Sequence, residues 1–119
     1  MAIRTAPSIQ MTRTLVADTV VLEVRGELDL ATAPELCREI ETETAGGERL
    51  VIDLSGLTSC DTSSLRALVG AIEESEIRMC EIAVAAVPGS ALDRLLDVTG
   101  TREFLRAAPT RSAAVSALG

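Results

Sequence analysis

The sequence predicts a single α/β domain in which helices pack on a mixed β-sheet. Three patterns support this fold class: strand-like and helix-like segments alternate, the first two strand-like segments adjoin across a short turn, and a central apolar run precedes an amphipathic helix. With 119 residues, 47% of them apolar, the chain is large enough for one hydrophobic core. We expect residues 1–8 to form a flexible N-terminus and residues 9–119 to form the domain.

The chain is expected to open with a β-hairpin. Residues 19–26 alternate like a strand with one mainly buried face, which carries Val20, Leu22 and Val24. Val21 belongs to the opposite, more polar face. A strand over residues 9–16 is expected to pair with it through a two-residue turn in which Asp18 supplies the turn chemistry.

Two helices flank the central strand of the pattern. The first is expected to begin with Thr32 as its N-cap and Pro34 in its first turn, and to end at Gly46-Gly47. The apolar residues Leu50, Val51, Ile52 and Leu54 show little alternation, which predicts a strand covered on both faces. A second helix over 63–75 follows, because its apolar residues recur at i, i+3, i+4 and i+7: Leu65, Leu68, Val69 and Ile72.

The last third of the chain repeats this order. Residues 80–87 are typical of a strand, and residues 88–100 of a helix that Pro88 starts. Phe104 and Leu105 are expected to add a short edge strand. The segment from Pro109 onward predicts a C-terminal helix, with Thr110 or Ser112 near its start.

Charge and composition exclude several kinds of partner. The net charge is −7, all 11 basic residues are Arg, and Phe104 is the sole aromatic residue, so neither a polyanion nor stacked nucleic-acid bases are expected to bind. The longest apolar runs reach six residues, as in IAVAAV at 82–87, against roughly 18 for a membrane span. We therefore expect a cytoplasmic protein that binds neither nucleic acid nor membrane and needs no cofactor.

The three cysteines do not predict a disulfide framework or a metal site. Cys37, Cys60 and Cys80 are widely spaced, odd in number, and accompanied by no histidine. They are interpreted as reduced and mostly buried small apolar residues. The alternative is a redox role for Cys60, which lies beside Asp61 in a predicted loop.

Four oxygen-bearing side chains lie where the central strand meets the second helix. Asp61 is well suited to cap the helix, but a cap needs one oxygen and leaves Thr62, Ser63 and Ser64 unexplained. The helical period places Ser63 with Arg66, Gly70 and Glu74 on the side away from the apolar stripe. Ser63 is therefore expected to face solvent, and Gly70 keeps that face flat enough for a partner surface.

A hydroxyl in the first turn of a helix is suited to carry a phosphate. The helix dipole and free N–H groups favour negative charge there, and Arg66 lies one turn on. Beside Asp61, about −1.5 to −2 of added charge would disrupt a close interface. Nucleophilic catalysis is disfavoured, since the chain has no histidine to act as base, no nearby lysine and no Gly-x-Ser-x-Gly elbow. The stretch also lacks the Gly-x-x-x-x-Gly-Lys signature of a P-loop. The neighbouring acids Glu27 and Asp29 could in principle act as a general acid and base. Charged residues at the solvated end of a strand are far more common, and we interpret them in this way.

Three stretches together resemble the STAS family, and in particular the bacterial anti-sigma factor antagonists: VVLEVRGELDLATAPEL at 20–36, LVIDLSGLTSCDTSSLRALVGA at 50–71 and PGSALDRLLDVTG at 88–100. The resemblance implies a mostly parallel sheet of four or five strands, opened by an antiparallel strand, with helices mainly on one face.

The same resemblance implies a function without catalysis. Antagonists of this class bind an anti-sigma serine kinase of the GHKL type, release a sigma factor, and are inactivated when the kinase phosphorylates a serine that a phosphatase can reset. The family's D-S-S-G-L pattern maps the acceptor onto Ser63, with Thr62 and Ser64 as alternatives and Ser64 in place of the usual glycine. Partner binding is expected from the surface formed by Asp29, Asp61, Thr62, Ser63, Ser64, Arg66 and Gly70. Other STAS proteins are unphosphorylated scaffolds, in stress-signalling complexes or beside lipid-transport ATPases.

Overall fold

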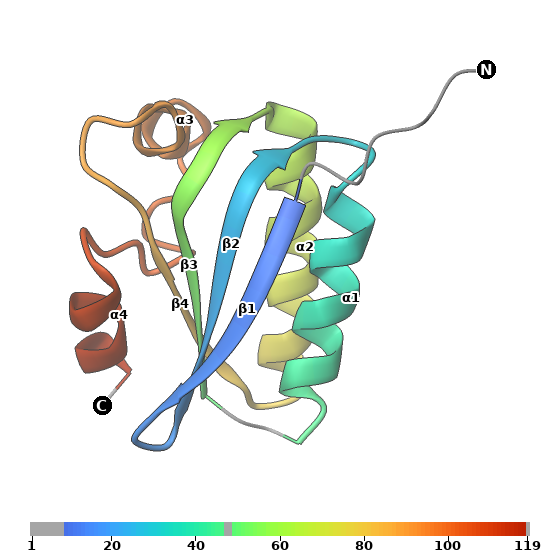
Figure 1. The fold of residues 1–119 in the computed structure, drawn as a ribbon, viewed down its shortest axis with the longest axis vertical. Helices are drawn as coiled ribbons and strands as arrows, with labels where there is room; N and C mark the ends of the chain where they lie inside the picture. The colour runs from blue at the N-terminus through green and yellow to red at the C-terminus, as the bar shows by residue number, and fades with distance from the viewer. Residues whose placement is uncertain (1–8, 47–48, 119) are drawn as a thin grey trace.

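The protein is a four-stranded mixed sheet with helices on both faces (Figure 1), as a computed structural model that describes residues 9–46 and 49–118. The strands lie in chain order β1-β2-β3-β4; β1 is antiparallel to β2, and the other two pairings are parallel. Strand bounds are β1 Ile9–Val16, β2 Thr19–Leu28, β3 Arg49–Cys60 and β4 Glu81–Ala85. Helix bounds are α1 Ala33–Thr44, α2 Thr62–Ile77, α3 Ala91–Thr99 and α4 Arg111–Ala117. The predicted fold class is confirmed.

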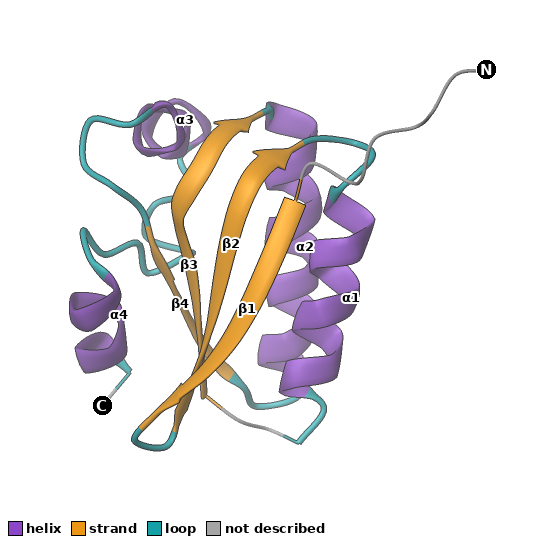
Figure 2. Ribbon diagram, in the orientation of Figure 1, coloured by secondary structure: helices purple, strands orange, loops and turns teal. Residues whose placement is uncertain are grey.

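The main core lies between the sheet and α1, α2 and α3. It contains Ile52 of β3 and Leu68 of α2, both no more than 1% exposed, together with Leu96 of α3. Figure 2 shows α1 and α2 side by side against one face of the sheet and α4 against the other. The helices therefore lie mainly on one face, as the resemblance implied.

A smaller core on the second face of the sheet explains why Val21 is buried, although its face of the strand was predicted to be the more polar one. Val21 is fully buried, because Ala114 and Leu118, from α4 and its C-cap, pack on the second face of the sheet with Val51 and Ala83. β3 is accordingly buried on both faces over its first half, as its sequence predicted.

Two details of the predicted turns and caps differ. In the β1–β2 hairpin, Ala17 rather than Asp18 takes the left-handed backbone conformation, with φ of 54°. α3 begins later than predicted: Ser90, not Pro88, is the N-cap, and its hydroxyl accepts a hydrogen bond from the Asp93 N–H at 3.1 Å. α1 ends at Thr44, and the Gly47 expected at its end lies outside the described residues.

The edge strand predicted at Phe104 and Leu105 is wrong. Residues 102–106 form a turn, in which Arg106 has a φ of 50°. The carbonyl of Leu105 accepts a hydrogen bond from the Val84 N–H at 3.1 Å, but the sole β-bridge found in this region joins Ala85 to Ala108. The Leu105 side chain enters the main core, where it is 1% exposed, and this burial accounts for the apolar residue that suggested a strand.

The C-terminal helix α4 is held on the sheet by side-chain ion pairs as well as by its apolar face. Thr110 caps the helix, accepting a hydrogen bond from the Ala113 N–H at 3.0 Å. Arg111 then donates hydrogen bonds to the Asp53 carboxylate at 2.9 Å and to the Glu23 carboxylate at 2.9 Å, and forms an ion pair with Asp53 at 2.8 Å. We call these three residues the α4 ion cluster. No helix within the described ranges is long and apolar enough to cross a membrane.

Candidate functional site

The predicted site residues gather at the edge where β2 and β3 end. Leu28 pairs with Cys60 in the parallel register, so the residues that follow, Asp29 and Asp61, leave the sheet next to each other. α2 starts directly after Asp61, and its first turn lies at the same end of the molecule as the β2–α1 loop (Figure 1). The fold thus brings together two acidic residues that are 32 positions apart in the chain.

Asp61 is the N-cap of α2. One of its carboxylate oxygens, Oδ1, accepts hydrogen bonds from the Ser64 hydroxyl at 2.6 Å and from the Ser64 N–H at 2.8 Å. These bonds stabilise the ionised form and hold the pKa of the Asp61 carboxyl below its ordinary value. The predicted capping role of Asp61 is confirmed.

Ser63 and Ser64 have opposite environments although they are neighbours. The Ser64 side chain is fully buried, and its hydroxyl proton is used in the bond to Asp61. Ser63 is exposed, as are Thr62 and Arg66. As the second residue of α2, Ser63 lies where helix N–H groups have no carbonyl partner within the helix. The predicted exposure of Ser63 is confirmed.

The β2–α1 loop is built around Asp29. Its carboxylate oxygen Oδ1 accepts hydrogen bonds from the N–H groups of Ala31 at 2.9 Å and Thr32 at 3.0 Å. Thr32 is the N-cap residue of α1 by position, but its hydroxyl makes no cap and instead donates to the Glu27 carbonyl at 2.8 Å. Asp29 therefore shapes the loop, whatever it does with a partner.

Leu30 is a surface feature that the sequence reasoning missed. It lies beside Asp29 in this loop and is 73% exposed. A leucine in a short turn after a strand was the available signal, because no periodic pattern assigned it to the core. A single exposed leucine is common on protein surfaces, so Leu30 marks an interface only if a partner is shown to cover it.

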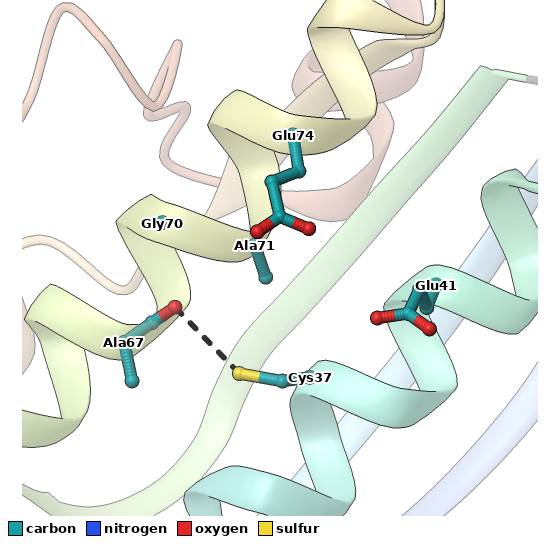
Figure 3. Close-up of a pocket in the computed structure, with 6 residues that line it drawn as sticks. All are labelled: Cys37, Glu41, Ala67, Gly70, Ala71 and Glu74. Atoms are coloured by element: carbon teal, nitrogen blue, oxygen red, sulfur yellow. Dashed lines mark hydrogen bonds between the residues drawn. The ribbon is translucent and has the colours of Figure 1, made fainter.

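Gly70 opens a groove between α1 and α2. Figure 3 shows its lining: Cys37, Glu41, Ala67, Gly70, Ala71 and Glu74, around a volume of about 250 Å³. A Cβ atom built on Gly70 would meet nothing within 4 Å, so the glycine is not required by crowding in the folded chain. We call this the α1–α2 groove.

The cysteines are free, but only Cys80 is buried. Cys37 and Cys60 are half-buried, which corrects the expectation that most of the three are in the core. Burial, and then the charge of Asp61, raise the pKa of the Cys60 thiol to about 11, which disfavours the reactive thiolate. Within the described residues no three Cys, Asp or Glu side chains gather as metal ligands.

A family model described as "Mlab, STAS domain" matches residues 11–107. The chain belongs to the STAS domain family. The match runs from within β1 to just past the turn after α3 and includes every residue predicted for the site, while α4 follows the matched segment.

Solved structures of anti-sigma factor antagonists share this fold. An anti-sigma factor antagonist from Mycobacterium paratuberculosis is similar with 28% identity and a TM-score of 0.83, covering 97% of this chain and 98% of that one. The unphosphorylated form of the anti-sigma factor antagonist SpoIIAA has 20% identity and a TM-score of 0.69, over 89% and 93% of the two chains. Its phosphorylated form, from Bacillus, has 19% identity and a TM-score of 0.66, over 92% and 100%. No curated protein matches the sequence.

Proposed function

We propose that this STAS protein is an anti-sigma factor antagonist: it binds an anti-sigma serine kinase of the GHKL type, thereby releases a sigma factor, and loses that kinase when Ser63 is phosphorylated. The observation that carries the proposal is the contrast at the start of α2. Ser63 offers an exposed hydroxyl, whereas the Ser64 hydroxyl is buried and bonded to Asp61. The similarity to the mycobacterial antagonist over nearly the whole chain supports the same role.

The environment of Ser63 suits a phosphate that prevents binding without unfolding the domain. Two charges added in the first turn of α2 meet the positive end of the helix dipole, which stabilises them. The same charges lie two residues from Asp61, at the sheet edge where Asp29 also leaves its strand, so a partner that complements this acidic edge would meet a changed surface. Magnesium, nucleotide and the base that accepts the hydroxyl proton belong to the kinase, and the chain contributes only the acceptor.

The decisive experiment is incubation of the purified chain with a GHKL-type serine kinase from the same organism and ATP, followed by mass spectrometry. We expect one phosphate, on Ser63, and none on Ser63→Ala. Ser63→Ala should bind the kinase constitutively, and Ser63→Glu should bind about a hundredfold or more weakly. Modification of Thr62 would move the acceptor by one residue, and a chain that binds the kinase but is never phosphorylated would refute the switch.

The partner surface is tested with paired variants of Asp29. Asp29→Asn removes the charge but keeps a side-chain oxygen that can accept the two loop N–H bonds. Asp29→Ala removes the charge and the oxygen together, and with it both loop hydrogen bonds. Weaker kinase binding by Asp29→Asn, with unchanged thermal stability, is the result expected if the charge itself contacts the kinase. Equal binding by wild type and Asp29→Asn would restrict Asp29 to a structural role.

The alternative function is an unphosphorylated scaffold or regulatory subunit, in a stress-signalling complex or beside a lipid-transport ATPase. The description of the matching family model, Mlab, names no sigma factor, so the family match by itself does not favour the antagonist. Purification of partners from native cells separates the two: an ATPase subunit recovered without any serine kinase would favour the scaffold.

A further inference from the structure

A second hollow borders the first two turns of α2, on a different side of the helix from the α1–α2 groove. It has a volume of about 160 Å³ and lies between the start of α2 and the end of α3. We call it the α2–α3 pocket; it is lined by Thr62, Leu65, Arg66, Val69, Thr99 and Thr101. Because Thr62 and Arg66 also belong to the surface around Ser63, the pocket is continuous with the proposed kinase site.

The floor of the α2–α3 pocket is apolar. Leu65 is buried and Val69 is half-buried, and both pack with the main core. Cavities of about 150 Å³ with aliphatic and aromatic linings hold a benzene-sized group. The pocket therefore has the volume for a single apolar side chain, which would rest on Leu65 and Val69 inside a polar rim.

The rim on the α3 side has no hydroxyl proton to spare. The Thr99 hydroxyl donates to the Leu95 carbonyl at 2.7 Å, so its oxygen accepts the proton of Thr101, 2.9 Å away. Both protons are used within the chain. A carboxylate placed at the mouth of the pocket would find no donor on this side.

The rim on the α2 side carries a guanidinium that is not engaged. Arg66 is exposed and, across residues 9–46 and 49–118, makes no hydrogen bond or ion pair, although acidic residues outnumber basic ones by 18 to 11. Arg102 and Arg111, by contrast, each hold two carboxylates. Arg66 is thus free to hold an acidic group that a partner supplies.

We propose that the α2–α3 pocket receives an apolar side chain of the partner kinase, that Arg66 pairs with a carboxylate adjacent to it in the same kinase segment, and that phosphate on Ser63 withdraws Arg66 from this pair. The proposal rests on the proposed function and specifies how the switch acts. Ser63 and Arg66 are three residues apart on one helix, where side chains are neighbours. A phosphate accepts the paired N–H donors of a guanidinium in the same way as a carboxylate.

The two acceptors compete for one guanidinium. In the unphosphorylated chain Arg66 serves the kinase carboxylate across the interface, and in the phosphorylated chain the intramolecular phosphate is always close to it. The kinase carboxylate is then left beside a phosphate with no cation between them. Loss of an attraction and gain of a repulsion at the same position explain how one group on an exposed helix turn can dissociate a whole interface.

The pocket is tested by filling it in the full chain and measuring the dissociation constant for the purified serine kinase that phosphorylates Ser63. Thr101→Met extends a longer side chain over the apolar floor and should weaken binding about tenfold or more, with thermal unfolding showing a folded domain. Thr14→Met, the same exchange at an exposed position on β1, is the matched control and should bind like wild type. A folded Thr101→Met that also binds like wild type would overturn the pocket.

The competition is tested by measuring the effect of Ser63→Glu in two backgrounds. Arg66→Gln should weaken binding of the unphosphorylated chain about tenfold and should reduce the further loss caused by Ser63→Glu by a similar factor. Arg106→Gln, an exposed arginine outside the pocket, should change neither value. If Ser63→Glu costs the same affinity with and without Arg66, the phosphate does not act through Arg66.

The two proposals fail in distinguishable ways. A chain that binds no serine kinase refutes the antagonist role, and with it the pocket as a kinase contact. A chain that is phosphorylated on Ser63 and released, but whose Thr101→Met and Arg66→Gln variants match wild type, keeps the antagonist role and refutes the pocket alone.

Discussion

Ser63 and Ser64 have different environments because they point to different sides of α2. Successive helical side chains are rotated by about 100°, so when Leu65, Leu68 and Ile72 face the core, position 64 is turned inward and position 63 outward. The buried Ser64 hydroxyl is satisfied by Asp61, which a buried polar group requires. The STAS pattern usually has glycine at position 64, and here the serine is accommodated without an unsatisfied hydroxyl.

Leu68→Ala should show which face of α2 carries the stability. Leu68 is 1% exposed and packs in the main core with Ile52, so the truncation leaves a cavity and should lower the free energy of unfolding by about 2–5 kcal/mol. Denaturant unfolding measures it, with Val98→Ala, at a position 83% exposed, as the control that changes little. A loss below about 1 kcal/mol for Leu68→Ala would contradict the assigned face.

Gly70→Ala should separate stability from binding. Alanine is a better helix former than glycine by roughly 1 kcal/mol, and its Cβ meets nothing within 4 Å, so the variant should be more stable than wild type. If the kinase approaches the exposed face of α2 closely, the same methyl group should reduce its affinity. Thermal unfolding and calorimetric titration with the kinase check the two effects, and unchanged affinity would place Gly70 outside the interface.

At the scale of elements, the α4 ion cluster holds α4 on the second face of the sheet, whereas α1, α2 and α3 are held on the first face by apolar packing. α4 has seven residues and buries Ala114, with Leu118 buried just after it, which is a small apolar contact for a helix. Arg111 adds two carboxylate partners from two strands, and Asp53 is 3% exposed in this arrangement. The position of α4 therefore depends on a charge network as much as on its apolar side.

Arg111→Ala should release α4. It leaves the buried Asp53 carboxylate with hydrogen bonds from Ser55 only, at 2.6 and 3.0 Å, and should reduce stability by about 1–3 kcal/mol. This is less than for a fully buried ion pair, because the Arg111 side chain is 38% exposed and water screens the pair. Chemical denaturation against the control Arg106→Ala measures it. Hydrogen exchange should become faster around Val51, and equal stability of the two variants would exclude the cluster as a fixing contact.

Asp53 should also make the domain sensitive to acid. Burial by itself raises the pKa of the Asp53 carboxyl, but hydrogen bonds from Ser55 and Arg111 outweigh it, and the folded pKa lies below the ordinary value. The resulting stability is present above about pH 4, the unfolded pKa, and is lost as pH falls through the lower folded pKa. Asp53→Asn should flatten this part of the curve of unfolding free energy against pH. Curves of equal slope below pH ~4 would contradict the assignment.

For the whole molecule, the order of elements was predictable because each element is encoded locally. Apolar periodicity located α2, start and stop signals located α1, and the apolar residues Leu50, Val51, Ile52 and Leu54 identified a strand buried on both faces. The burial of Val21 was not predictable, because Ala114 and Leu118, which cover it, come from a helix at the far end of the chain that packs on the second face of the sheet. The apolar pair at 104–105 was misassigned as a strand, because burial in a turn and burial in a strand produce the same two-residue pattern.

The candidate site was predictable to the same extent. The exposure of Ser63 follows from helix phase, and the meeting of Asp29 with Asp61 follows from parallel strands ending at one edge. The α2–α3 pocket has no sequence signal, because Thr99 and Thr101 are brought beside Thr62 by packing of two helices that are distant in the chain. Kinase binding and phosphorylation stay predictions.

Phosphorylation should change the binding of the molecule and leave its fold unaltered. Ser63→Glu places a negative charge in the first turn of α2, which is favourable by about 0.3–1 kcal/mol, so the melting temperature should be unchanged or slightly raised. NMR chemical shift changes should be confined to α2 and its neighbours, with Ser63→Gln as the uncharged control. Broad changes across the sheet would mean that the modification acts through the fold.

The bond between Ser64 and Asp61 has a consequence for how the kinase would have to be assayed. A synthetic peptide covering residues 58–70 is too short to keep a stable helix by itself, so in it the Ser63 and Ser64 hydroxyls are expected to be equally accessible. Discrimination between them would then be a property of the folded domain and absent from its linear sequence. Peptide arrays would report a kinase with relaxed site selection, whereas the intact protein would report a single site.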